Sequence, residues 1–172
     1  LLLSVILGIV FLGTLYPLIA EALSGQKLSV GPPYFDSVAS PLALLLAALM
    51  IIAPQLRWRR DSAPILPRLA PGVLVAVVVL VASLILTPVI GLLPRLGLAV
   101  GGGLVPASLQ PLFGRSLWRT PLATWGMAVA HLGVAVAIIG VASDSAFTRE
   151  KLAAARPRDR VDVGPWLVGF GN

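Results

Sequence analysis

The chain has 172 residues, of which 58% are apolar and only 12% are charged, whereas a soluble domain averages about 25% charged residues. The mean hydropathy is +0.96, and several long runs carry no charge. These values exclude an ordinary soluble domain. They predict an all-α fold, a polytopic bundle of transmembrane helices.

The net charge is +6, but the arginines lie mostly in short segments between apolar runs. Such segments set the orientation of a membrane protein, so we expect membrane lipid as the surroundings and no nucleic acid as a partner. The chain has no cysteine and one histidine. Disulfides and thiolate metal sites are therefore excluded, and a zinc site within the chain is disfavoured.

The apolar runs predict about five spans, at residues 1–22, 38–56, 71–93, 95–113 and 121–143. Gly25 is expected to end the first helix. Ser40 is the expected N-cap of the second, with Pro41 at the first helical position. The third is expected to start at Pro71 and to bend at Thr87-Pro88.

The fourth span holds three consecutive glycines at 101–103, together with Pro106 and Pro111. Such a segment is either a broken helix that lines a ligand site or a helix packed closely on its neighbours. We favour close packing. No Lys-Ser/Thr pair follows the glycines, so they do not form a nucleotide-binding loop.

The basic residues predict the orientation. Among the loops between spans, 57–70 carries four basic residues and 114–120 carries two, against one in each of the other two loops, so these two loops are placed in the cytoplasm. The N-terminus then lies in the cytoplasm, and the tail after residue 143 lies outside.

Residues 144–172 form a polar tail. A short helix is expected at 148–155, ended by Pro157, and the alternating apolar residues from Val161 to Phe170 predict a β-hairpin split by Gly164-Pro165. We therefore divide the chain into a membrane region, 1–143, and the start of an external β domain, 144–172. Because residue 1 falls inside an apolar run and the chain stops in a β segment, we expect a piece of a longer protein.

His131 is the residue on which function depends. It lies roughly 15 Å along the fifth span from Pro121, near the middle of a hydrocarbon layer about 30 Å thick. An imidazole is costly there unless it faces protein, a cofactor or water. The small residues Gly126, Gly133 and Gly140 fall on the opposite side and suggest a helix-packing seam.

Three interpretations of His131 remain open on the residues alone. It could hydrogen-bond to another helix, it could belong to a proton path, or it could be an axial ligand of haem. A proton relay usually needs an acidic partner, and the expected spans two to five contain none. A six-coordinate haem would need a second ligand, which the chain lacks.

Segments in order along the chain resemble the CcmF/NrfE family of cytochrome c-type biogenesis proteins. The helix around His131 is similar to the family pattern G-M-x-x-A-H-x-G-x-A, and residues 146–166 resemble the opening of the family's last periplasmic domain. The remaining matches are Leu12-Gly13-Thr14, Tyr16-Pro17, Ser29-Val30-Gly31, Pro33-Tyr34-Phe35 and Ala53-Pro54 with Arg57-Trp58.

The resemblance implies a subunit of the haem lyase in the bacterial inner membrane. Such a subunit takes haem from the chaperone CcmE and attaches it to apocytochrome c, beside CcmH/CcmI-type lyase subunits. It also implies that His131 is one axial ligand of a transmembrane haem b. No catalytic residue is carried over.

The family's tryptophan-rich external segment and external histidines are absent from this sequence, so the chain alone is not expected to perform the ligation. The alternatives are a haem exporter, or a structural or transport membrane protein with a packing histidine.

Overall fold

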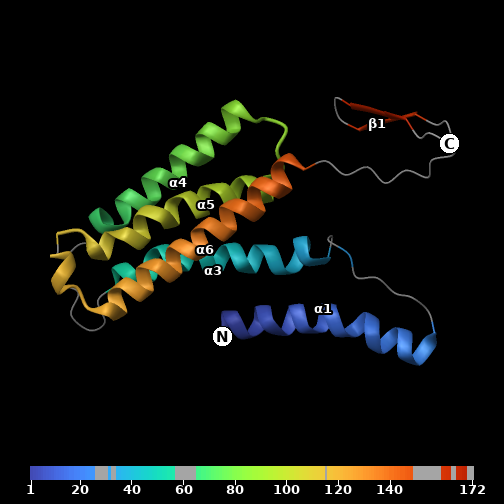
Figure 1. The fold of residues 1–172 in the computed structure, drawn as a ribbon, viewed down its shortest axis with the longest axis horizontal. Coiled ribbons are helices and arrows are strands. Elements are labelled where there is room, and N and C mark those ends of the chain that lie inside the picture. Colours follow the sequence, from blue (N-terminus) through green and yellow to red (C-terminus); the bar gives the residue numbers. More distant parts are fainter. Residues whose placement is uncertain are drawn as a thin grey trace.

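The computed structural model describes residues 1–25, 31, 34–56, 65–114, 116–148, 160–163 and 166–169. Within them, five helices are long and apolar enough to cross a membrane, which confirms the predicted polytopic all-α fold (Figure 1). The α-helices and strands are α1 (Leu2–Ser24), α3 (Ser40–Ile52), α4 (Leu66–Leu86), α5 (Leu92–Leu109), α6 (Leu122–Phe147), β1 (Arg160–Val163) and β2 (Trp166–Gly169). The second membrane-length segment is Phe35–Gln55, in which a π-helical turn and a 3-10 turn extend α3 at its two ends.

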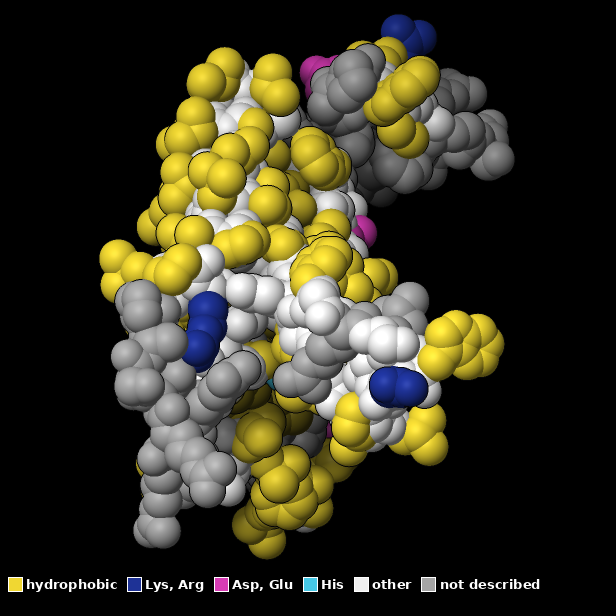
Figure 2. Space-filling model, turned by 90° about the vertical axis from the view of Figure 1, so that its left-hand side faces the viewer, with side chains coloured by type: hydrophobic (Ala, Val, Ile, Leu, Met, Phe, Trp, Pro, Cys, Tyr) yellow, Lys and Arg dark blue, Asp and Glu magenta, His cyan; other side chains and the backbone are white. Residues whose placement is uncertain are grey.

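Helix α5 occupies the centre of the bundle. It packs between α4 and α6 and also contacts α3 (Figure 1), and it is the most buried of the five membrane-length helices. A small core lies where α3, α5 and α6 meet, made of Ile51, Leu104, Ala107 and Ala135. Large apolar side chains cover much of the outer surface (Figure 2), as expected where lipid rather than water surrounds the helices.

The glycines of α5 allow close packing, as predicted. A Cβ built on Gly103 would lie 2.7 Å from the backbone oxygen of Gly72 in α4. On other faces of α5, a Cβ on Gly97 would lie 2.8 Å from Cβ of Ala142, and one on Gly101 would lie 2.8 Å from Cγ1 of Ile139. Helix α5 therefore approaches both neighbours at distances that only glycine permits.

The second span begins earlier than predicted, so the expected N-cap at Ser40 is wrong. A π-helical turn, Phe35–Ala39, runs directly into α3. Ser40 is already helical, and its Oγ donates to the carbonyl of Phe35 at 3.3 Å. Because residues before Ser40 already have helical dihedral angles, Ser40 is not the residue at which the helix starts.

The third span also differs at both ends. Helix α4 begins at Leu66 rather than at Pro71, with Pro67 in the first turn, where a missing N–H costs nothing. At the other end, Thr87-Pro88 terminates the helix instead of bending it. A residue before proline is driven out of the α region, and Thr87 has φ −136° and ψ 67°.

Helix α1 ends as predicted, at Gly25, which has φ 68° and whose N–H donates to the carbonyl of Glu21. Its contact with the bundle is centred on Gly13. The aromatic ring of Tyr34 lies over this glycine, and the Tyr34 and Phe35 rings meet edge to face with centroids 5.2 Å apart.

The predicted hairpin is present, because β1 and β2 pair antiparallel, with Val161 opposite Val168. Gly164, Pro165 and Phe170 lie outside the described residues. So does the short helix expected at 148–155, except for Thr148, which is extended and follows the last residue of α6.

Candidate functional site

His131 lies in the middle part of α6, as the tenth of its 26 residues. At about 1.5 Å per residue, it is roughly 5 Å from the midpoint of the helix. The side chain is half-buried. The structure therefore gives the imidazole an intramembrane depth if α6 spans the bilayer.

The backbone of α6 holds one nitrogen of the ring. Nδ1 of His131 lies 2.9 Å from the carbonyl oxygen of Met127, one turn earlier. A carbonyl only accepts hydrogen bonds, so Nδ1 carries the proton and donates it. In the neutral ring, Nε2 then carries no proton. Its lone pair can accept a hydrogen bond or bind a metal ion.

Helix α6 packs on its neighbours through alanine rather than glycine. Ala128, Ala135 and Ala142 recur every seven residues and are buried. By contrast, a Cβ on Gly126, Gly133 or Gly140 would meet no described atom within 4 Å. The prediction that the glycines form the packing seam is therefore wrong for the described helices, although the glycines do lie on the side away from His131.

Acidic groups lie far from the imidazole along α6. Asp144 is thirteen residues farther on, about 20 Å along the axis. The described residues contain no group of three or more His, Cys, Asp or Glu side chains that could hold a metal ion. Along α6, no acidic side chain is therefore close enough to exchange a proton directly with the imidazole.

A pocket of about 380 Å³ lies between α3, α5 and α6. Its lining on α6 starts at Val134, one turn after His131, and runs to Ser145. The sequence did not indicate the pocket or its polar residues Asp36, Ser40 and Ser145. The available signal was that Asp36 and Ser145 lie at the ends of two spans expected on the same side of the membrane.

Fold and site together define a polytopic helical membrane protein with one histidine inside its bundle. Comparison with known proteins narrows this broad class to a family. The chain is 34% identical to the cytochrome c-type biogenesis protein CycK of Rhizobium meliloti over an alignment 175 residues long, which covers 94% of this chain. It is 44% identical to CcmF of Pseudomonas fluorescens over 80 residues, and 40% identical to the probable NrfE of Escherichia coli over 75 residues.

The chain belongs to the CcmF/CycK/NrfE family of cytochrome c-type biogenesis proteins. These matches cover 46% of this chain for the Pseudomonas protein and 44% for the Escherichia protein. The chain spans about a quarter of the Rhizobium relative, 26%, and 12% and 13% of the other two. No family model and no solved structure matches it.

Proposed function

We propose that the chain takes part in cytochrome c maturation as part of a haem lyase subunit, and that His131 supplies one axial ligand of a haem b within the membrane. One observation carries the assignment to His131. Its Nδ1 is bound by its own helix, which leaves Nε2 available inside an apolar bundle.

The residues present fit this role. Haem iron takes an imidazole ligand, and the partner of the second ring nitrogen fixes the tautomer and the orientation of the ring. Here the carbonyl of Met127 is that partner. Ala128 and Ala135, one turn before and one turn after His131, are buried and present only small side chains beside the imidazole. A haem b held there would exchange single electrons, which suits chemistry that requires ferrous haem.

The proposed partners are haem, the chaperone CcmE, apocytochrome c and CcmH/CcmI-type lyase subunits, in the bacterial inner membrane. The basic loops favour a cytoplasmic N-terminus and a periplasmic tail. We assign no catalytic residue in this chain and propose that ligation requires groups that it does not contain.

The test is a reduced-minus-oxidised absorption spectrum of the purified full-length protein, wild type beside His131→Ala. We expect a b-type signal that the variant loses. The matched control is Thr124→Ala, two turns earlier on the same side of α6, which should keep the signal. A wild-type protein without haem, or a variant with an unchanged signal, would contradict the assignment and return His131 to a packing role.

A further inference from the structure

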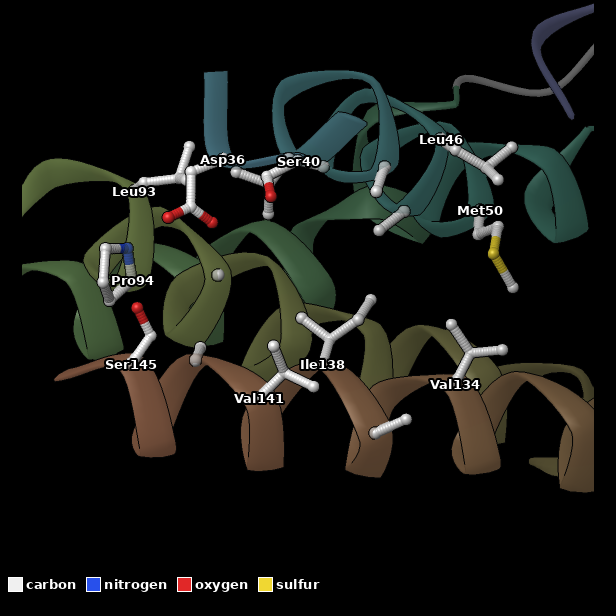
Figure 3. Close-up of a pocket in the computed structure, with 16 residues that line it drawn as sticks. Asp36, Ser40, Leu46, Met50, Leu93, Pro94, Val134, Ile138, Val141 and Ser145 are labelled. Atoms are coloured by element: carbon white, nitrogen blue, oxygen red, sulfur yellow. The ribbon is translucent and has the colours of Figure 1, made fainter. Parts of the chain in front are cut away.

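The pocket between α3, α5 and α6 is polar at one end only. Of its 16 lining residues, three have polar side chains: Asp36, Ser40 and Ser145. Figure 3 shows these three beside Leu93 and Pro94, whereas Met50 and Val134 lie toward the opposite end. An apolar cavity with a few polar groups that fix orientation is the usual form of a small-molecule site.

The polar end lies at the level of the helix ends. Asp36 precedes α3, Leu93 and Pro94 belong to the first turn of α5, and Ser145 belongs to the last turn of α6. From Ser145 the lining runs down α6 to Val134, eleven residues or about 17 Å. That depth is about half of a hydrocarbon layer roughly 30 Å thick, so the pocket spans one leaflet.

A depth of one leaflet with a single polar end matches a lipid rather than another transmembrane helix. A packing helix would need an apolar groove along the full span. An acyl chain instead enters from its own leaflet and keeps its head group at the membrane surface.

The charge of Asp36, at the polar end of the pocket, indicates which lipid head group fits there. Asp36 is exposed, and no hydrogen bond or ion pair joins its carboxylate to another described residue. The basic side chain nearest in sequence to the α5 part of the lining is Arg95, whose Nε is buried without a hydrogen-bond partner among the described residues. Nη2 donates to the carbonyls of Thr87 and Pro88 at 3.0 and 3.4 Å. The carboxylate thus favours a head that brings a cation with N–H donors and disfavours an anionic head.

We propose that this pocket binds one acyl chain of an aminophospholipid such as phosphatidylethanolamine, with the ammonium group at Asp36. The net charge of +6 would by itself attract anionic lipid, so a preference for the ethanolamine head distinguishes this site from nonspecific binding.

The experiment uses the full-length protein in detergent and native mass spectrometry. It measures the lipid retained after purification and the affinity of delipidated protein for phosphatidylethanolamine and phosphatidylglycerol. We expect one retained phosphatidylethanolamine and tighter binding of that lipid. Ala137→Phe fills the pocket wall and should abolish retention. The matched control is Ala123→Phe, an exposed alanine on the same side of α6 but outside the lining.

Asp36→Asn provides a second variant that does not depend on filling the pocket. It should weaken phosphatidylethanolamine binding by about two- to fivefold, the range for an exposed ion pair, and remove the preference over phosphatidylglycerol. Equal lipid retention by Ala137→Phe and wild type, a preference for phosphatidylglycerol, or a retained quinone in place of phospholipid would each overturn the proposal.

Discussion

At the scale of single residues, the imidazole of His131 leads to a prediction that goes beyond loss of haem. Methionine also ligates haem iron, and a methionine ligand raises the reduction potential. If His131 is an axial ligand, His131→Met should keep a b-type signal with a higher midpoint potential, whereas His131→Ala should lose the signal. Redox titration of the full-length protein measures both. An unchanged potential in the methionine variant would show that the ring does not contact the iron.

Gln55 provides a second residue-scale prediction, on stability. It is 6% exposed, and its Nε2 donates to the carbonyl of Ala107 at 3.2 Å. That carbonyl would normally bond to the N–H four residues later, but position 111 is proline and has none. The side chain of Gln55 therefore replaces the missing backbone donor near the end of α5.

Gln55→Leu should consequently cost about 1–3 kcal/mol, the penalty for an unpaired buried polar group. The same substitution in a Pro111→Ala background should cost less, because the alanine N–H can bond to the free carbonyl. Thermal unfolding of the four proteins in detergent gives the coupling between the two positions. Equal losses of stability in both backgrounds would show that the Gln55 side chain does not stand in for the missing backbone N–H at position 111.

At the scale of helices, the approach of α5 to α4 depends on backbone contact at Gly103. An added methyl group would lie 2.7 Å from a backbone oxygen and 2.9 Å from Cβ of Ala76, and the oxygen cannot move without moving α4. Gly103→Ala should destabilise the protein by about 1–3 kcal/mol, as overpacking generally does. The measurement is the unfolding temperature in detergent.

Gly140→Ala is the matched control, because a Cβ there meets no described atom within 4 Å and alanine favours a helix over glycine. It should leave the unfolding temperature unchanged or raise it. If both variants lose stability equally, the cost comes from glycine replacement in general rather than from close packing between α4 and α5.

The sequence predicted the helices better than it predicted their ends and faces. Apolar length alone identified five spans, and Gly25 and the hairpin pattern identified local structure correctly. The start of α4 was missed because Pro71 is tolerated inside the helix. The packing face of α6 was assigned to glycine because its sequence is apolar on every side. No amphipathic pattern then separates the face toward protein from the face toward lipid.

The candidate site was predictable only in part. His131 was found because a polar residue inside an apolar span is costly and therefore conspicuous. Its bond to the carbonyl of Met127 could not be predicted, since it depends on the rotamer. The pocket was missed because it joins residues of three helices, and the packing that brings Asp36 near Ser145 is not encoded in any local pattern.

At the scale of the whole molecule, the chain contains no cysteine, so single cysteines placed in it test its orientation in full-length protein whose cysteines outside this chain are replaced by serine. In intact spheroplasts, a membrane-impermeant maleimide should label Thr148→Cys, just after α6, and should not label Ser116→Cys, in the loop between α5 and α6. Both should react after lysis. Labelling of Ser116→Cys alone before lysis would invert the proposed topology.

The hydrogen bond from Nδ1 of His131 to Met127 also bears on the order of assembly. Both groups belong to one turn of α6, so the bond can form as soon as that turn is helical, whether or not other helices have arrived. The bond fixes Nδ1 as the ring nitrogen that carries the proton, and it does so as soon as this turn of α6 forms during membrane insertion. If His131 is the haem ligand proposed above, loading of haem is accordingly a late event in biogenesis, one that completes a helix already formed without refolding it.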